Sequence, residues 1–531
     1  MCAENLLLNS MKYLIIYFFV FCVTKVPAQN KMGYTWIVGY NVDFAKFNGT
    51  SSLPLTGQKF NASHPSTPMM FTRAHSNICD SLTGNIILST GGMILYDSAG
   101  YIIENGDSLQ PTKAYTYNNP AEIPVTQGTI ILPKGTENEY YVIIPTVSDS
   151  LYDINILNPT GTGKFPFDLL RYNIVDMKQN GGSGKVVQKN KILLRNVELS
   201  KVMMQACKHA NGIDWWLLKH ASYNNTVYRF LVTKDSIYGP YVQSFSEPVW
   251  GWFDLYGQST FSKDGKKYGA VMGKSNKLFL ADFDRCSGEL SNPKVINIPI
   301  DSTTDPYWDN QNARDSLSGG ISFSLNGDFV YISKRWNVYQ FEVGESDSNL
   351  AWYRVVHGFD TTKIAFEGYG QLYRAPDNRI YIGKVGNSFT QFSVIDNPDN
   401  KGAACNFCRK CFRIDTADGG LTSPPNMPDY ELGPDTTISC WPLIAAEVNG
   451  NVQWKIYPNP ATDNVTVSYH SAMPLHFSLY NLLGQEMMTY TLPAGVIQKE
   501  LLLSANLQGL YFYTVSNKHG IITQGKLSCN R

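Results

Sequence analysis

Short apolar segments separated by polar turns recur along most of the chain. The clearest are FSKDGKKYGAV (Phe261–Val271), FSLNGDFVYIS (Phe323–Ser333) and LYRAPDNRIYIG (Leu372–Gly383). In each, an Asp-Gly, Asn-Gly or similar pair stands between two β-rich runs, because a tight turn needs the positive φ that Gly and Asn tolerate. The pattern predicts β-hairpins.

Weaker copies of the hairpin pattern surround three further glycines, so six turn residues are visible. They are Gly84, Gly135, Gly212, Gly265, Gly327 and Asn378, separated by 51, 77, 53, 62 and 51 residues. Units of about fifty residues without helical segments between them predict an all-β fold with a β-propeller of six or seven blades. A seventh blade would lie in the widest gap or be closed by the N-terminal strand Trp36–Val42. A sandwich of irregular hairpins is the alternative.

The last eighty residues carry a different pattern. Val465, Val467 and Tyr469 alternate as in a half-buried strand. Pro458 and Pro460 fix φ and lack N–H donors, so the chain enters this strand from a rigid extended segment that cannot pair with the preceding region. The pattern predicts a small Ig-like antiparallel β-sandwich that folds separately.

The N-terminus predicts export. Met11-Lys12 precede the apolar run Tyr13–Val23 and the small-residue approach Val26–Ala28, as in a signal peptide, and the run is too short to span a membrane. We expect a signal peptide over residues 1–28, a propeller over 29–440, a linker over 441–453 and the sandwich over 454–531. No transmembrane segment is expected in the mature chain.

Composition agrees with an exported all-β protein and argues against a nucleic-acid partner. Lys and Arg balance Asp and Glu at 44 each, and charged residues make up 17 % of the chain, against roughly 25 % in average globular proteins. A nucleic-acid footprint would need a basic excess. The 13 % aromatic content suits half-buried pleated surfaces.

One cysteine cluster raises the question of a metal. In CNFCRKC, three thiols lie three residues apart, and a fourth cysteine follows later; together they are Cys405, Cys408, Cys411 and Cys440. Four sulfurs could hold zinc, but structural zinc sites usually have two separated pairs. An exported context favours disulfides or free thiols. We expect no metal and no cofactor.

The sequence offers no catalytic motif. The histidines His64, His75, His209, His220 and His357 are scattered, without HExxH, GxSxG, P-loop or GxGxxG contexts. We interpret His209 beside Asp214 as a turn brace. Paired carboxylates for glycoside cleavage remain open, since sequence does not report their separation.

Two regions resemble known families. HANGIDWWLLKH (His209–His220), SVIDNPDNKGAACNF (Ser393–Phe407) and PNMPDYELGP (Pro425–Pro434) resemble propeller-type regions of large surface proteins from bacteria with a type IX secretion system. WKIYPNPATDNVTVSY, FSLYNLLGQEM, LQGLYFYTVSN and ITQGKLSC closely resemble, in order, the type A C-terminal sorting domain of type IX cargo. The positions that carry the second resemblance are Tyr457, Pro458, Asn459, Pro460, Asp463, Gly484, Gly509, Tyr511 and Lys526.

The sorting-domain resemblance implies a route. The signal peptide would lead to the periplasm, and the type IX machinery would carry the protein across the outer membrane, to be secreted or held on the outer surface. A sortase-like peptidase would cut between Cys440 and Trp454, often with attachment to anionic lipopolysaccharide. Cys529, near the end of the last strand, departs from the family pattern.

Ten Asp-Ser or Asp-Thr triplets have two interpretations. Each is followed by Ala, Leu, Ile or Thr, and they begin at Asp80, Asp97, Asp107, Asp149, Asp235, Asp301, Asp315, Asp360, Asp415 and Asp435. They resemble the O-glycosylation signal of the same bacterial group. They are also good turn dipeptides, which propellers need in number.

Two functions remain for the propeller. Loops rich in Trp and Tyr, such as WGWFDLYG (Trp250–Gly257), would contact a glycan or protein ligand. The alternative is a secreted hydrolase or lyase with acids at the propeller mouth, drawn from Asp254, Asp282, Asp284 and Glu367. The sequence favours binding over catalysis because no acid–base constellation stands out.

Overall fold

The protein is described from a computed structural model. It covers residues 30–40, 43–48, 52–54, 69–113, 122–123, 125–135, 138–157, 167–247, 257–273, 276–300, 318–334, 336–347, 350–357, 368–385, 390–413, 423–437, 454–469, 471, 474–482, 485–496, 498–517 and 520–530. Their secondary structure consists of strands joined by turns and loops, with the helix α2 (Asp149–Leu157) and the short 3-10 helices η1 (Asn180–Gly182) and η2 (Gly402–Cys405). The all-β prediction is confirmed.

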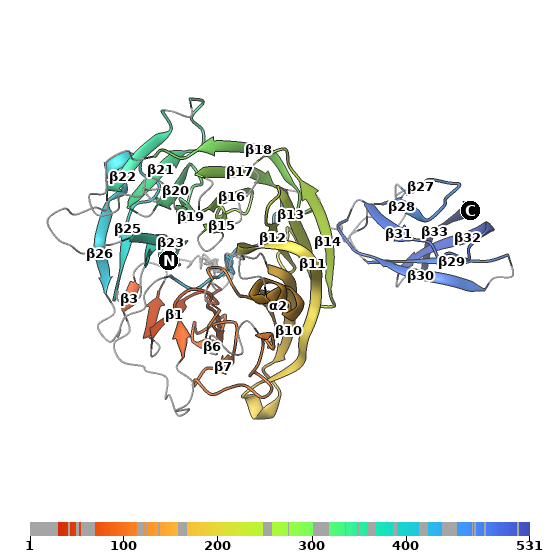
Figure 1. Ribbon diagram of the computed structural model, residues 1–531, viewed down its shortest axis with the longest axis horizontal. Helices are drawn as coiled ribbons and strands as arrows, with labels where there is room; N and C mark the ends of the chain where they lie inside the picture. Colours follow the sequence, from red (N-terminus) through yellow and green to blue (C-terminus); the bar gives the residue numbers. More distant parts are fainter. Residues whose placement is uncertain are drawn as a thin grey trace, which may run out of the picture.

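Seven antiparallel blades surround a central channel (Figure 1). Blade 1 contains β1 (Thr35–Tyr40), β2 (Asp43–Phe47), β3 (Ser52–Pro54) and β4 (Met70–Phe71). Blade 2 contains β5 (Ser76–Cys79), β6 (Ile86–Thr90) and β7 (Leu95–Asp97). Blade 3 contains β8 (Ile130–Pro133), β9 (Glu139–Thr146), β10 (Phe167–Asp176) and the first part of β11 (Lys185–Lys208).

The remaining blades follow the same order. Blade 4 contains the last part of β11, β12 (Trp215–Ala221), β13 (Thr226–Val232) and β14 (Ile237–Ser244). Blade 5 contains β15 (Gly257–Phe261), β16 (Lys267–Met272), β17 (Lys277–Phe283) and β18 (Leu290–Asn297). Blade 6 contains β19 (Ser318–Phe323), β20 (Phe329–Lys334), β21 (Asn337–Glu342) and β22 (Trp352–His357). Blade 7 contains β23 (Gly368–Arg374), β24 (Ile380–Val385), β25 (Gln391–Ile395) and β26 (Phe407–Arg413).

The six predicted turn residues each lie between the first and second strands of one blade, blades 2 to 7. Their φ angles are 74° at Gly84, 69° at Gly135, 74° at Gly212, 71° at Gly265, 76° at Gly327 and 66° at Asn378. All are in the left-handed region, which explains why Gly or Asn recurs there. The spacing of these turn residues in the sequence therefore reflects one such turn in each of blades 2 to 7.

The seventh blade comes from the N-terminus. The expected strand Trp36–Val42 begins in β1, which pairs with β2 and β4. The interval of 77 residues between Gly135 and Gly212 holds β9, α2, β10 and β11 in its described part. Of the two predicted places for a seventh blade, the N-terminal one is correct.

Long strand β11 belongs to two blades. Its residues from Lys185 to Leu199 pair with β10, and those from Met204 to Lys208 pair with β12. A single sheet of seven strands, from β14 to β8, therefore joins blades 3 and 4.

Packing between neighbouring blades forms the core. Blades 4 and 5 meet through residues such as Trp216 and Tyr268. Blades 1 and 7 close the ring, where Trp36 packs edge-on against Tyr381 with ring centres 5.4 Å apart. No described strand hydrogen-bonds blade 1 to blade 7, so side-chain packing holds this seam.

The C-terminal region forms two small sheets outside the ring (Figure 1). One contains β27 (Lys455–Tyr457), β28 (Asn464–Ser468) and β31 (Gln498–Leu502). The other contains β29 (Leu475–Tyr480), β30 (Glu486–Leu492), β32 (Gly509–Asn517) and β33 (Gly520–Cys529). They enclose a core of their own, which includes Val465, Val467 and Tyr469, and no described strand is shared with the propeller. The predicted small antiparallel sandwich is confirmed, and Tyr241 of β14 packs against its core.

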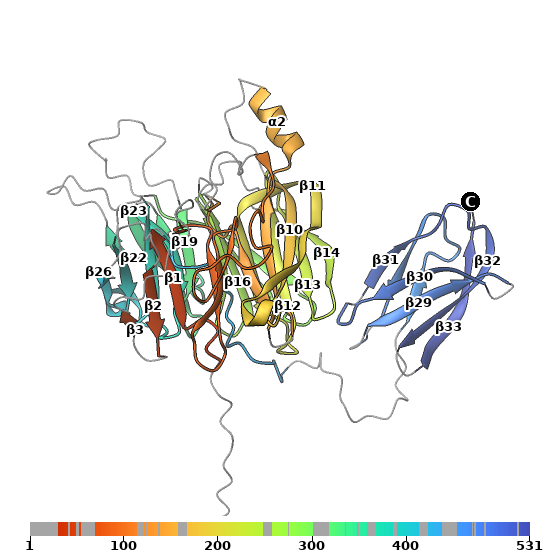
Figure 2. The same ribbon diagram turned by 90° about the horizontal axis from the view of Figure 1, so that it is seen from below.

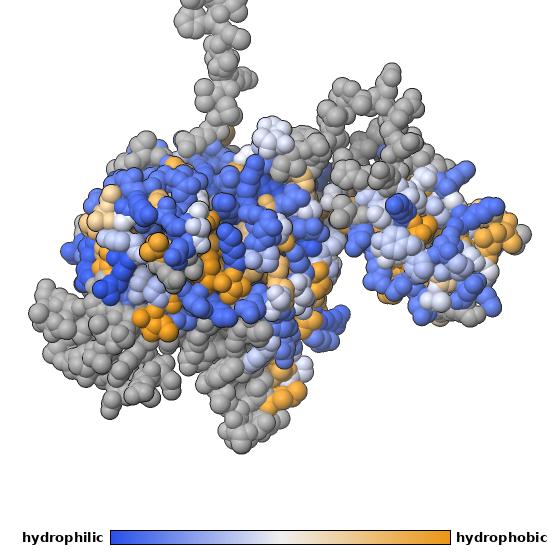
Figure 3. Space-filling view, turned by 90° about the horizontal axis from the view of Figure 1, so that it is seen from above, coloured by the Kyte–Doolittle hydropathy of each residue, from blue (hydrophilic) through white to orange (hydrophobic). Residues whose placement is uncertain are grey.

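The surface seen in Figure 3 is largely hydrophilic over both regions, with separate apolar patches. In the described part of the chain, no helix has the length and apolar character needed to cross a membrane.

Candidate functional site

The first loop of the C-terminal region is joined to its last strand by the Asn459 side chain. The Asn459 Nδ2 donates to the main-chain oxygen of Lys526 at 2.9 Å, and the main-chain N–H of Ser528 donates to Asn459 Oδ1 at 2.9 Å. Both partners lie on the outer edge of β33. An unpaired strand edge is a template for association, so Asn459 occupies hydrogen-bonding groups that another strand would otherwise use.

Ala461 extends this junction. Its N–H donates to the oxygen of Ser528 at 2.8 Å, and its oxygen accepts from Asn530 N–H at 2.8 Å. Pro458 and Pro460 have no N–H, so Ala461 supplies the next donor along this segment. We call Asn459 and Ala461, with their partners on the last strand, the tail clamp. It links segments 67 residues apart in sequence.

Other predicted motif positions lie around the same strand. Gly509, with φ of 99°, pairs with the buried Cys529, and Tyr511 is buried opposite Leu527. The Tyr511 hydroxyl accepts from Gln508 N–H at 3.1 Å. The Lys526 ammonium lies 5.9 Å from the ring centre of Phe512.

The remaining motif positions lie apart from the clamp. Tyr457 is exposed on β27 and pairs with Thr466. The main-chain oxygen of Asp463 accepts from Leu503 N–H at 2.8 Å. Gly484 lies outside the described residues. The structure thus gathers Asn459, Gly509 and Lys526 about one strand and leaves Tyr457 on the other sheet.

Residues 423–437, which we call the channel plug, follow blade 7 and cross one mouth of the central channel, on the face opposite α2 (Figure 2). The 1 % exposed Asn426 makes six hydrogen bonds there. It donates to the oxygens of His75, Thr129 and Met204 and accepts from Gln127, Gln205 and Tyr373, at 2.8–3.3 Å. These partners lie in or just before β5, β8, β11 and β23. One residue therefore connects four blades, with its main-chain N–H bound to blade 2 and its side chain bound to blades 3, 4 and 7.

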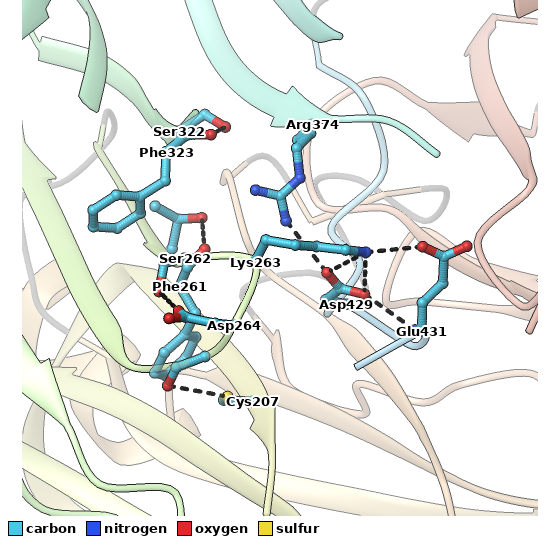
Figure 4. A network of polar contacts seen from close by, with 12 residues as sticks. Cys207, Phe261, Ser262, Lys263, Asp264, Ser322, Phe323, Arg374, Asp429 and Glu431 are labelled. Atoms are coloured by element: carbon cyan, nitrogen blue, oxygen red, sulfur yellow. Dashed lines mark hydrogen bonds and ion pairs between the residues drawn. The ribbon is translucent and has the colours of Figure 1, made fainter. Parts of the chain in front are cut away.

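The plug also carries charge into the mouth. Lys263 lies 2.9 Å from Asp429 and 2.8 Å from Glu431, and Arg374 lies 3.3 Å from Asp429 (Figure 4). Burial alone would raise the pKa of Asp429, but Lys263 and Arg374 outweigh it and hold that pKa below its usual value. Tyr34 donates to Glu431 at 3.1 Å. The lowered pKa of Asp429 does not suit a general acid, which would need a raised pKa.

Little space is left at this mouth. The cavity beside the plug has a volume of about 100 Å³ and is lined by Tyr34, Phe261, Lys263 and Arg374 among others. Small-molecule sites are typically about 300–1,000 Å³. The plugged mouth is therefore a structural closure.

The C-terminal region matches a family model. The model described as "Secretion system C-terminal sorting domain" aligns with residues 455–528. Residues 455–528 are a sorting domain of the type IX secretion system. The chain is therefore type IX cargo with a propeller passenger, and secretion across the outer membrane by the type IX machinery follows from that domain.

Solved structures resemble the passenger weakly. A putative 6-phosphogluconolactonase from Bacteroides fragilis has 10 % identity, with a TM-score of 0.41, and covers 76 % of this chain and 97 % of its own. One from Bacteroides uniformis has 13 % identity, with a TM-score of 0.39, covering 73 % and 97 %. The periplasmic gluconolactonase PpgL of Pseudomonas aeruginosa has 12 % identity, with a TM-score of 0.35, covering 89 % and 99 %. These scores support no inference about activity. No curated protein matches the chain significantly.

The cysteine triplet is divided. Cys408 and Cys411 form a disulfide with Cα atoms 5.7 Å apart, and Cys405 is a buried free thiol. Cys440 lies outside the described residues. Within the described ranges, no group of three His, Cys, Asp or Glu side chains is arranged to hold a metal. Cys286 is also disulfide-bonded.

His209 braces its turn in the passenger, as the sequence suggested. Its Nδ1 accepts from Asn211 N–H at 3.0 Å, so the proton lies on Nε2, which donates to the oxygen of Cys286 at 3.0 Å. The main-chain N–H of His209 donates to the oxygen of Asp214. Burial lowers the pKa of His209, which keeps the ring neutral.

The acids proposed for catalysis do not meet in the described part of the passenger. Asp282 accepts from Asn292 Nδ2 at 2.8 Å, and Asp284 accepts from Cys286 N–H at 2.8 Å and from the Ser287 hydroxyl. Both stabilise the turn between β17 and β18. Asp254 and Glu367, together with most of Trp250–Gly257, lie outside the described residues.

Three of the Asp-Ser and Asp-Thr triplets in the described ranges stabilise turns. Asp80, Asp97 and Asp435 accept hydrogen bonds from main-chain N–H groups two to four residues later. The following hydroxyl residue is exposed at Ser98, Ser108, Ser150, Ser236 and Thr436. The triplets at Asp301, Asp315, Asp360 and Asp415 lie outside the described residues.

Proposed function

We propose that the passenger binds a glycan or protein ligand at the mouth of the propeller opposite the plug, on the outer surface or outside the cell. The observation that supports this is the closure of one mouth by Asn426 and the ion pairs of Lys263. A ligand that uses the channel must then approach from the other face.

The direction of the strands supports a ligand site at that other face. The turns after the first strands lie beside the plug, because a Cβ built on Gly212 would be 2.8 Å from Pro434 and one on Gly265 would be 2.8 Å from Leu432. The first strand of each blade therefore starts at the opposite face. Trp250–Gly257 leads into the start of β15, and aromatic rings stack well on sugars.

The ligand proposal is tested with secreted protein on immobilised glycans and on outer-surface extracts. Trp250→Ala with Trp252→Ala should reduce binding at least tenfold without lowering Tm. The control is Tyr353→Ala, which removes a 39 % exposed aromatic from outer strand β22. Equal binding by both variants would contradict the proposal. Turnover of a bound glycan, lost on Asp254→Asn or Glu367→Gln, would support the hydrolase or lyase alternative instead.

For export, we propose that the tail clamp is the part of the sorting domain that the type IX machinery recognises. Asn459 is exposed and holds the end of the last strand at the surface. A sortase-like peptidase would then cut in residues 441–453. The route would begin with the signal peptide, residues 1–28, and end in release or attachment to anionic lipopolysaccharide.

The export proposal is tested by fusing residues 441–531 to an exported, fluorescent carrier in a type IX-competent host. The wild-type fusion should reach the outside, and Asn459→Ala should leave it in the periplasm. Asn481→Ala, on an exposed turn of the same domain, is the matched control and should export normally. A clamp variant exported as well as the control would rule out recognition through the clamp.

We also propose that the exposed Asp-Ser and Asp-Thr triplets are O-glycosylated during export. The exposed hydroxyls at Ser98, Ser108 and Ser236 support access by a transferase. Peptide mass spectrometry of the secreted protein should find hexose-containing additions at these residues. Unmodified peptides at all of them would leave the triplets as turn residues alone.

A further inference from the structure

A disulfide lies on the outermost strand of blade 7, where a reactant from solvent can reach it. Cys408 and Cys411 are in β26, which pairs only with β25 among the described strands. Cys411 is exposed, and Cys408 is half-buried. The pairing of β25 with β26 is irregular here, and Lys410 has φ of 57°, so the two intervening residues bulge out of the ladder. The bond is therefore open to a reactant from solvent.

The surroundings of this disulfide are basic. Arg409 and Lys410 stand between the two cysteines, Arg413 follows, and all three are exposed. The positive field of these side chains reaches Lys384 on β24. Burial lowers the pKa of Lys384, and the charge of Arg409 lowers it further, to about 8. Positive charge stabilises thiolates and attracts anionic reactants.

The other described sulfurs differ. Cys405 is buried, and burial raises the pKa of its thiol, so it is a poor nucleophile. The disulfide at Cys286 follows Asp284, whose carboxylate accepts from Cys286 N–H at 2.8 Å. Arg285, directly before Cys286, is buried and donates its guanidinium hydrogen bonds to main-chain oxygens. One disulfide thus has exposed basic side chains around it, and the other has a buried arginine and the acid Asp284 beside it.

We propose that Cys408–Cys411 is a thiol–disulfide exchange site for anionic low-molecular-weight thiols. The substrate thiolate attacks Sγ of the exposed Cys411, the S–S bond breaks, and Cys408 leaves as a thiolate that takes a proton. A second substrate thiolate attacks the substrate sulfur of the mixed disulfide, and Cys411 leaves. Two electrons pass to the protein, and two substrate thiols become one disulfide.

The test compares the two disulfides within one molecule. Secreted full-length protein is treated with glutathione, an anionic thiol, or cysteamine, a cationic one, at equal thiolate concentration. Acid quenching, alkylation and peptide mass spectrometry then give separate rates for the Cys408–Cys411 and Cys286 bonds. Glutathione should reduce Cys408–Cys411 at least tenfold faster than the Cys286 bond, and cysteamine should show a smaller ratio. The preference should shrink in 0.5 M salt, which screens exposed charges.

Charge variants separate electrostatics from exposure. Arg409→Gln with Lys410→Gln should slow the glutathione reaction at Cys408–Cys411 several-fold. Lys191→Gln with Arg195→Gln removes the same charge from exposed positions of β11 and should leave the rate unchanged. Cooperative unfolding of each variant checks that it is folded.

Three results would overturn the proposal. The secreted protein could contain Cys408 and Cys411 as free thiols, the two bonds could be reduced at equal rates, or reduction could occur only in denaturant. Cys408→Ser with Cys411→Ser should abolish the exchange signal and leave the Cys286 rate unaltered.

Discussion

An asparagine ties together distant segments in both the passenger and the sorting domain, but the two residues are in opposite environments. Asn426 is buried in the channel and makes six hydrogen bonds to residues in or next to four inner strands. Asn459 is exposed, and its side chain makes two hydrogen bonds to one edge strand. Lost hydrogen bonds cost most where water cannot replace them. The comparison teaches that the plug serves stability and that the clamp is free to serve recognition.

The largest effect is expected from Asn426→Ala. It leaves the amides of Gln127 and Gln205 and the Tyr373 hydroxyl without their Asn426 acceptor in a buried site, so the free energy of unfolding should fall by about 3–4 kcal/mol. Guanidinium titration of the full chain, followed by tryptophan fluorescence, measures this. A loss below about 1 kcal/mol would show that water replaces the plug contacts and would end the contrast with Asn459.

Acid should distinguish the two regions next. Burial lowers the pKa of His220 in the passenger to about 3, while its Nε2 lies 2.6 Å from the Tyr268 hydroxyl. The unfolded chain, with a His pKa near about 6.5, binds the proton that the folded state refuses, so stability falls as pH drops below about 6.5. From pH 7 to pH 5 the loss should be about 2 kcal/mol from this group.

His220→Gln should flatten that pH dependence, although it lowers stability at pH 7. In the sorting domain, the described histidine His476 is exposed on β29, so His476→Gln is the matched control and should keep the slope. Thermal unfolding at pH 5, 6 and 7 compares them. An unchanged slope in His220→Gln would assign the acid sensitivity to other groups, such as His209.

The smallest thermodynamic effect is expected from Asn459→Ala. Because its partners are exposed and water can replace the amide, the sorting domain should lose only about 0.5–1 kcal/mol. Hydrogen exchange at Ser528 N–H should nevertheless accelerate. If stability fell as far as in Asn426→Ala, the clamp would be a structural element of the same kind as the plug.

Local chemistry explains which parts of the fold the sequence predicts. Positive φ at Gly265 or Gly327 is required by the turn itself, so the six hairpins and their spacing are visible without knowledge of the ring. Blade 1 lacks such a turn signal, and its inner strand β4 has two residues, which is why the sequence predicts two places for the seventh blade.

The contacts of the channel plug and the tail clamp form only when distant segments of the chain come together. Asn426 reaches the oxygen of Thr129 across 297 residues, and Asn459 reaches Lys526 across 67. No local pattern marks such partners. Resemblance identifies the sorting motif in the sequence, but it does not predict that Asn459 binds the last strand. Likewise CNFCRKC shows three thiols, while only the bulge in β26 determines that Cys408 bonds to Cys411 and Cys405 stays reduced.

The uninterrupted strand β11 makes the circle of blades mechanically uneven. Blades 3 and 4 share one sheet, so tension across that border is carried by covalent backbone and a ladder of hydrogen bonds. At the border of blades 7 and 1, no described strands are joined by a ladder, so side-chain packing carries the load. Residues 423–437 brace this border, because Asp429 pairs with Arg374 and Glu431 accepts from Tyr34. A polypeptide threaded through a narrow pore would finish assembly at this border, and a pulled molecule would rupture there first.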